Sequence, residues 1–207
     1  MCAREYDRRL GIKTVGLREW DGHDQYHRYE ATPYRALERL FQAYRFRPGD
    51  RVVDFGCGRG RVTFAIHHRF HVPVVGIEAH AKTYEEALRN KRSYRRNAKH
   101  IPAPITLKYG LAENYKVKPM DNRFYFFNPF FHRVFKKVMG NIMKSIAAAP
   151  RPVDIILYYP VPEYKDILKE LCFQMINKIK VPHAEDDREK FLIYRYPLER
   201  PADCDMP

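Results

Sequence analysis

The chain has 207 residues, of which 45% are hydrophobic and 14% aromatic. It is long enough for one domain with a sizeable core, and too apolar to be intrinsically disordered. Lys and Arg number 38 against 25 Asp and Glu, giving a formal net charge of +13. A domain this basic favours anionic partners, such as a nucleic acid or another polyanion.

Membrane insertion and export are not expected. No apolar run approaches the roughly 18 residues that a membrane-spanning helix needs, and the first residues lack the apolar stretch of a signal peptide. Cys2, Cys57, Cys172 and Cys204 are far apart, without paired spacing, and are expected to be reduced thiols. These features predict a cytoplasmic protein.

Hydrophobic spacing predicts that helices and strands alternate along most of the chain. A helix is expected over residues 33–46, where apolar residues recur at steps of three and four. The elements expected after it are strand 51–55, helix 62–70, strand 73–78, helix 82–99, strands 105–109 and 123–127, helix 132–149, strand 154–159 and helix 163–171. This alternation is typical of a mostly parallel sheet with helices on both faces.

The C-terminal end departs from this alternation of helices and strands. Residues 173–181 alternate between apolar and polar, and residues 191–196 form a second strand-like run. The polar connection between them is too short for a crossover helix, so the two strands should pair antiparallel. We expect a single domain over residues 1–207, with an N-terminal segment 1–32 as a candidate lid, a core 33–196 and a tail 197–207.

A glycine-rich turn follows the first expected strand, in Asp54-Phe55-Gly56-Cys57-Gly58-Arg59-Gly60. Glycines at alternate positions let the backbone turn sharply and let a ligand approach it closely. A dinucleotide site requires G-x-G-x-x-G, and Arg61 stands where the last glycine should be. The pattern D-x-G-x-G-x-G fits without a gap; the alternative is a tight connection without a ligand.

The sequence here resembles the class I methyltransferases that use S-adenosylmethionine, over about residues 30–196. The resemblance implies a Rossmann-like fold with a seven-stranded sheet, in which six strands are parallel and the last is inserted antiparallel. It also implies that Gly56, Cys57, Gly58 and Gly60 cradle the amino-acid end of the cofactor, with Asp54 facing its cationic part.

Two further landmarks of that family have counterparts in this chain. Glu78 ends the second expected strand, where a carboxylate can accept bonds from both ribose hydroxyls. After the third strand, where the family places a small residue and an acid beside the adenine, the chain has Ala112 and Glu113. The implied cofactor is S-adenosyl-L-methionine, and the implied product is S-adenosyl-L-homocysteine.

The fourth expected strand ends in Asn128-Pro129-Phe130, which is similar to the Asn-Pro-Pro-Tyr/Phe segment of amino-group methyltransferases. The Asn128 side chain and a backbone carbonyl can accept both protons of an amine and hold its nitrogen in line with the methyl group. Pro129 fixes the turn, and Phe130 offers a face for stacking a flat substrate. The alternative is a simple turn out of a buried strand, with the phenylalanines in the core.

Two other regions could contact substrate. Residues 89–99 contain six basic side chains and no acid, with Arg92, Arg96 and Lys99 on one helical face and Tyr94 available for stacking. The alternative is a solvated outer helix. Aromatic residues before the first helix either cover the cofactor or pack the segment onto the sheet: Trp20, Tyr26, Tyr29 and Tyr34. His23 and His27 are four apart, but no third ligand is evident, so no metal site is expected.

We therefore expect an S-adenosylmethionine-dependent methyltransferase. Its acceptor is an amino nitrogen of a nucleic acid or of a ribosome-associated protein on the first hypothesis. A small-molecule methyltransferase and a non-catalytic cofactor-binding interaction module are the alternatives. The sequence does not specify the oligomeric state.

Overall fold

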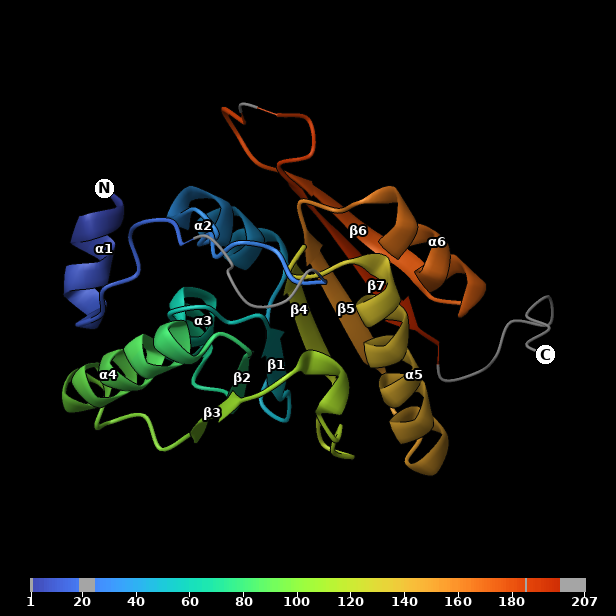
Figure 1. Cartoon of the computed structure of the whole chain (residues 1–207), viewed down its shortest axis with the longest axis horizontal. Helices are drawn as coiled ribbons and strands as arrows, with labels where there is room; N and C mark the ends of the chain where they lie inside the picture. Colours follow the sequence, from blue (N-terminus) through green and yellow to red (C-terminus); the bar gives the residue numbers. More distant parts are fainter. Residues whose placement is uncertain (1, 19–24, 185, 198–207) are drawn as a thin grey trace.

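Helices and strands alternate in the computed structural model much as the hydrophobic pattern predicts (Figure 1). The structure describes residues 2–18, 25–184 and 186–197. In chain order the elements are α1 (Ala3–Leu10), α2 (Tyr34–Ala43), β1 (Val52–Phe55), α3 (Arg61–Phe70), β2 (Val74–Glu78), α4 (Ala81–Asn97), β3 (Ile105–Tyr109), the short 3₁₀ helix η1 (Ala112–Asn114), β4 (Arg123–Phe127), α5 (His132–Ala148), β5 (Val153–Tyr158), α6 (Pro162–Glu170), β6 (Gln174–Lys180) and β7 (Lys190–Tyr196).

The strands form one seven-stranded sheet in the order β3-β2-β1-β4-β5-β7-β6. Strands β1 to β5 pair in parallel, and β7 runs antiparallel to both of its neighbours, β5 and β6. Six strands therefore share one direction and the last is inserted against them, as expected. The short connection between β6 and β7 allows only this hairpin, whose loop extends beyond the sheet in Figure 1.

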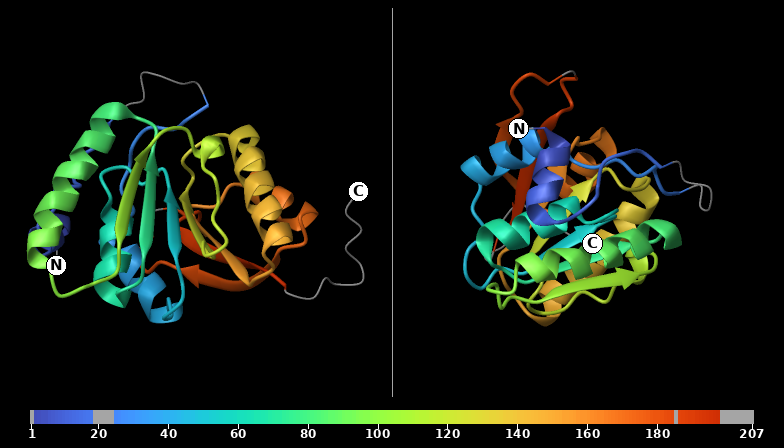
Figure 2. Two further views of the ribbon diagram at one scale, coloured as in Figure 1. Left: turned by 90° about the horizontal axis from the view of Figure 1, so that it is seen from below. Right: turned by 90° about the vertical axis from the view of Figure 1, so that its left-hand side faces the viewer.

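Helices cover both faces of the sheet (Figure 2). Val52 of β1 packs into a cluster with Leu37 of α2 and Phe64 of α3, on the face that α1 to α4 cover. Its neighbour Val53 packs into a second cluster on the opposite face, with Phe135 of α5. Both faces of the central strands are thus buried, which explains why their sequences are mostly apolar.

The first helix, α1, was not expected from the sequence. Within this helix, the Asp7 side chain is buried and accepts hydrogen bonds from the hydroxyl groups of Thr14 (2.7 Å) and Tyr34 (2.7 Å). Gly11 ends the helix with a φ of 70°. The beginning of the candidate lid is therefore a docked helix, and only the part that follows it can lie over the sheet edge.

Among the described residues, no helix is both long and apolar enough to cross a membrane. Cys2 and Cys57 are free thiols. Cys172 is disulfide-bonded, so the expectation of a reduced thiol is wrong for this residue. Cys204 lies outside the described residues.

A buried carboxylate in β5 ties the C-terminal hairpin to the rest of the domain. Asp154 has no exposed surface and accepts two hydrogen bonds from the Arg195 guanidinium of β7, at 2.7 and 2.8 Å. The Tyr44 hydroxyl, which follows α2, donates to the same carboxylate at 2.5 Å. One side chain thus joins β5, β7 and the end of α2.

We expect Asp154→Ala to lower the free energy of unfolding by about 3–5 kcal/mol, because it leaves the Tyr44 hydroxyl and the Arg195 guanidinium without their acceptor and removes the carboxylate that faces Arg123 at 3.6 Å. Urea denaturation measures this loss. Asp187→Ala, which removes an exposed carboxylate from the β6–β7 loop, is the control and should change stability by less than about 0.5 kcal/mol. A loss below about 1 kcal/mol for Asp154→Ala would contradict this role.

Candidate functional site

The glycine turn lies between the ends of β1 and β2. Gly56, Gly58 and Gly60 have φ angles of 72°, 56° and 90°, a region that side-chain-bearing residues avoid. The amides of Gly56 and Cys57 both donate to the Ile77 carbonyl, at 2.9 Å each. The turn is therefore fastened to the end of the neighbouring strand, where parallel sheets bind their ligands.

Close neighbours fill the space that side chains would occupy at these glycines. A Cβ at Gly58 would lie 2.1 Å from the Tyr29 ring, and one at Gly56 would lie 2.5 Å from the Pro129 side chain. The N-terminal segment and the loop after β4 thus both pack directly on the turn. Gly60 is different, since a Cβ there would meet Phe64 of α3 within the domain.

Glu78 is the central acidic group of the site. Its carboxylate is buried and accepts one hydrogen bond from the Gly58 amide and one from the His80 amide, each at 2.8 Å. Burial raises the pKa of Glu78, and the two amides act in the opposite direction. Each carboxylate oxygen keeps lone-pair capacity for a further donor, so the group can accept two more hydroxyl protons.

Asp54 lies deeper than Glu78. It is buried, and one of its oxygens accepts a hydrogen bond from the Thr63 hydroxyl at 2.7 Å, so it stabilises the start of α3. Burial raises the pKa of Asp54 to about 7. Cys57, also buried, fills the space over Gly76, as expected of a small packing residue.

Ala112 and Glu113 lie in η1, and the same tyrosine contacts both. The Tyr26 hydroxyl accepts a hydrogen bond from the Ala112 amide (2.8 Å) and donates one to the Glu113 carboxylate (2.7 Å). The Asn141 side chain of α5 donates to the Glu113 carbonyl at 2.7 Å and so fixes the position of η1.

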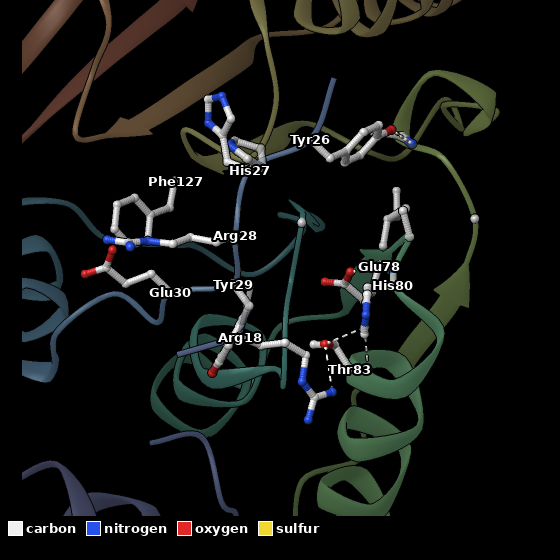
Figure 3. Close-up of a pocket in the computed structure, with 16 residues that line it drawn as sticks. Arg18, Tyr26, His27, Arg28, Tyr29, Glu30, Glu78, His80, Thr83 and Phe127 are labelled. Atoms are coloured by element: carbon white, nitrogen blue, oxygen red, sulfur yellow. Dashed lines mark hydrogen bonds between the residues drawn. The ribbon is translucent and has the colours of Figure 1, made fainter. Parts of the chain in front are cut away.

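A pocket at the carboxyl end of the sheet is lined by three of the predicted cofactor residues, Gly56, Glu78 and Ala112 (Figure 3), whereas Asp54 and Cys57 line a smaller one beneath the turn. Glu78, His80 and Thr83 border the first pocket on one side, and residues 26–30 run along the other. Gly56, Gly110 and Ala112 also line it. We call residues 25–30 the strap, because this extended segment crosses the sheet edge and separates this pocket from a second one.

The strap is held by the Asn-Pro-Phe loop. The His27 amide donates to the Pro129 carbonyl (3.0 Å), and His27 Nδ1 donates to the Asn128 carbonyl (2.8 Å). The Phe131 amide donates to the Gln25 carbonyl at 2.9 Å. The backbone carbonyls of Asn128 and Pro129 are thus both paired with the strap.

Asn128 lines the second pocket, on the other side of the strap, and has a φ of 38°. Aromatic and acidic residues surround it there, including Phe127, Phe131, Tyr159 and Asp186. The prediction that Phe130 offers a stacking face is wrong, because this ring has no exposed surface and packs against Phe126 and Tyr164. Of these two neighbouring rings, the solvent-exposed one is Phe131, which is 46% exposed.

The sequence analysis left the role of the aromatic N-terminal cluster open, and the structure divides it. Tyr26 and Tyr29 line the first pocket, whereas Tyr34 is buried against Asp7 and contributes to packing. His27, in the extended strap, contacts the Asn128 carbonyl. Trp20 and His23 lie outside the described residues. No group of three or more potential metal ligands occurs within the described part of the chain.

Basic side chains gather in a groove between α1 and α4. Arg4, Arg8, Lys13 and Arg89 line it, together with Arg59 of the glycine turn, which pairs with Glu86 at 2.7 Å. Farther along α4, Arg92 and Arg96 are exposed.

Tyr94 cannot add the stacking surface suggested for this helix. It is 1% exposed, and its hydroxyl contacts His67 of α3.

No family model matches the chain, and no curated protein matches it in sequence. Solved structures do match it in fold. An RNA methyltransferase from Salinibacter ruber, in complex with S-adenosyl-L-homocysteine, superposes with a TM-score of 0.60 at 14% identity, covering 86% of this chain and 100% of that one. A SAM-dependent methyltransferase from Methanosarcina mazei gives a TM-score of 0.60 at 13% identity, with coverage of 77% and 98%.

A putative RNA methyltransferase from Pyrococcus horikoshii covers more of this chain, 93%, and 97% of its own length, with a TM-score of 0.54 at 16% identity. At these identities the likeness is one of fold. The chain has the Rossmann-like fold of the S-adenosylmethionine-dependent methyltransferases, with a single α/β domain and an antiparallel C-terminal hairpin.

Proposed function

We propose that this chain is an S-adenosylmethionine-dependent methyltransferase. The observation that carries the proposal is the Glu78 carboxylate, buried at the end of β2 and oriented by the Gly58 and His80 amides toward a pocket. A buried charge is costly unless it is paired, and in the described part of the chain Glu78 is paired by backbone amides, with the charge of Arg18 nearby. Two hydroxyl groups of a ribose match its remaining acceptor capacity.

The other groups of the pocket fit the same cofactor. The Ala112 amide and the Glu113 carboxylate form a donor and an acceptor side by side, which matches the edge of an adenine. Gly56, Gly58 and Cys57 would hold the amino-acid end, and Asp54 would contribute negative charge from beneath the turn. The cofactor supplies an electrophilic methyl group on a sulfonium.

The second pocket is where we expect the acceptor. The Asn128 side chain lies there, and its amide oxygen can accept a proton of an amine while the neighbouring rings hold a flat group. Proton removal needs no strong base, since the proton can leave after methyl transfer. An amino nitrogen of a nucleic acid or of a ribosome-associated protein is the acceptor class that we propose, and the cytoplasm is the compartment.

Two observations support a nucleic acid. The groove between α1 and α4 concentrates cations that a phosphate backbone would attract. Two of the structures with the same fold are an RNA methyltransferase and a putative RNA methyltransferase. A small-molecule acceptor would leave this groove without a role.

Glu78→Gln tests the cofactor site. The amide keeps the volume of the carboxylate but loses its charge and turns a donor toward one of the two backbone amides. We expect S-adenosyl-L-homocysteine to bind at least about tenfold more weakly, measured by titration calorimetry. Glu85→Gln, at an exposed position of α4, is the matched control and should bind like the wild type. Equal affinity of the Glu78 variant would remove this residue from the site.

Asn128→Ala tests the reaction centre. We expect the rate of methyl transfer to fall about 100-fold while cofactor affinity stays within about twofold, because the side chain positions the acceptor and not the cofactor. The rate is measured as labelled methyl transferred to a cell extract, with nuclease and protease digests identifying the acceptor class. Glycine adopts the positive φ of residue 128 without strain. Asn128→Gly therefore removes the side-chain amide without the backbone strain that alanine adds. A glycine variant as fast as the wild type would exclude the side chain from the mechanism.

Reversing three charges tests the groove. Replacing Arg4, Arg8 and Arg89 by Glu should weaken RNA binding and reduce the slope of log affinity against log salt by about 2–3. The matched control reverses three exposed lysines of α5, Lys136, Lys137 and Lys144, on the opposite face. If both triple variants lose affinity equally, the groove has no special role.

A further inference from the structure

The Tyr26 hydroxyl occupies the position between two groups that the proposed function assigns to adenine. It lies 2.8 Å from the Ala112 amide nitrogen and 2.7 Å from a Glu113 carboxylate oxygen. The Ala112 amide makes no other hydrogen bond within the described part of the chain. A ligand that hydrogen-bonds to the Ala112 amide and the Glu113 carboxylate must therefore displace the Tyr26 hydroxyl from both groups.

The phenol satisfies these groups in a defined order, accepting from the amide and donating to the carboxylate. Burial raises the pKa of Tyr26, and its bond to Glu113 raises it further, so the hydroxyl stays protonated and remains the donor. Adenine offers the same pattern on one edge, because N1 accepts a hydrogen bond and the neighbouring N6 amino group donates one.

The rest of the strap holds Tyr26 in this position. On one side, His27 and Gln25 are hydrogen-bonded to the Asn-Pro-Phe loop, and the Tyr26 ring contacts Phe130 edge-on at 5.5 Å. On the other side, the Tyr29 ring covers Gly58, and its hydroxyl donates to the Thr14 carbonyl at 2.7 Å. Contacts on both sides of Tyr26 thus place the phenol between the Ala112 amide and the Glu113 carboxylate.

We propose that Tyr26 is an internal substitute for adenine that the base displaces when the cofactor binds, an inference that rests on the proposed function. An unpaired buried amide would be costly, and Tyr26 avoids this cost at Ala112 before the cofactor binds. A base replaces the phenol without loss of hydrogen bonds only if it presents an acceptor to the Ala112 amide and a donor to the Glu113 carboxylate. A 6-oxopurine presents N1–H and O6, the reverse order, and would face donor with donor.

Titration calorimetry with two ligands on three proteins tests this inference. The ligands are S-adenosyl-L-homocysteine and its deaminated analogue S-inosyl-L-homocysteine. The proteins are the wild type, Tyr26→Phe, which keeps the ring, and Tyr84→Phe, whose lost hydroxyl donates to the Leu107 carbonyl of β3. We expect the Tyr26 variant to bind the adenosyl ligand about tenfold more tightly than the wild type, because the phenol no longer competes. Tyr84→Phe should bind it like the wild type, and the inosyl ligand should bind every protein at least about 100-fold more weakly.

Hydrogen exchange at the Ala112 amide gives a second readout that does not depend on a ligand. Exchange should be about tenfold faster in ligand-free Tyr26→Phe than in the ligand-free wild type, and the adenosyl ligand should slow it again. If the Tyr26 variant binds that ligand no more tightly than the wild type, the substitution role is wrong while the proposed function stands. If both proteins fail to bind the adenosyl ligand although Ala112 exchange responds to the variant, the proposed function fails and this inference fails with it.

Discussion

The geometry of the site depends on the two hydrogen bonds that the Glu78 carboxylate accepts from the Gly58 and His80 amides. They connect the end of β2 to the glycine turn on one side and to the start of α4 on the other. A carboxylate buried to this degree must be paired. If the glycine turn or the start of α4 moved away, the buried charge would be left without one of its donors. The pairing in register of Phe55 with Ile77 places the turn within reach of Glu78. The cleft is therefore fixed at its acidic end by the sheet itself.

The opposite wall of the cleft is built differently. The strap contributes no strand to the sheet and is held by a few backbone bonds to the Asn-Pro-Phe loop and by the ring of Tyr29 on Gly58. Such a segment separates from the domain at much lower cost than a buried carboxylate does from its amides. One wall is thus held by a buried charge and the sheet, and the other by a few backbone bonds and ring contacts. Because the strap also lines the pocket around Asn128, any displacement of the strap changes both pockets together.

Much of the fold could be predicted because it follows from local patterns. The apolar runs predicted the strands, and the short polar connection after residue 181 allowed only a hairpin. The position of β7 between β5 and β6 followed from the resemblance to class I methyltransferases and not from this pattern. The glycine turn and Glu78 were recognisable for the same reason, since their spacing along the chain is short. Phe130 was misplaced because the sequence offers two adjacent phenylalanines, and only the fold shows that Phe130 enters the core while Phe131 is exposed. The contact of Tyr26 with Glu113 joins residues 87 positions apart, and no local pattern encodes it.

The net charge of +13 suggested a single basic surface that binds both a polyanion and the methyl acceptor. The distribution of charge over the structure separates these two tasks. The groove between α1 and α4 is lined by more cations than acids. The pocket around Asn128 is lined by three acids and one arginine: Glu30, Asp186, Glu189 and Arg28. Asp186 pairs with Arg188, and Glu189 pairs with Arg35. A phosphate entering that pocket would meet more carboxylates than cations, together with aromatic rings. A flat, uncharged group would meet surfaces suited to stacking. On the proposed function, the polyanion is therefore held at a distance from the reacting atom, and only a base or a side chain freed from its backbone charge enters beside Asn128.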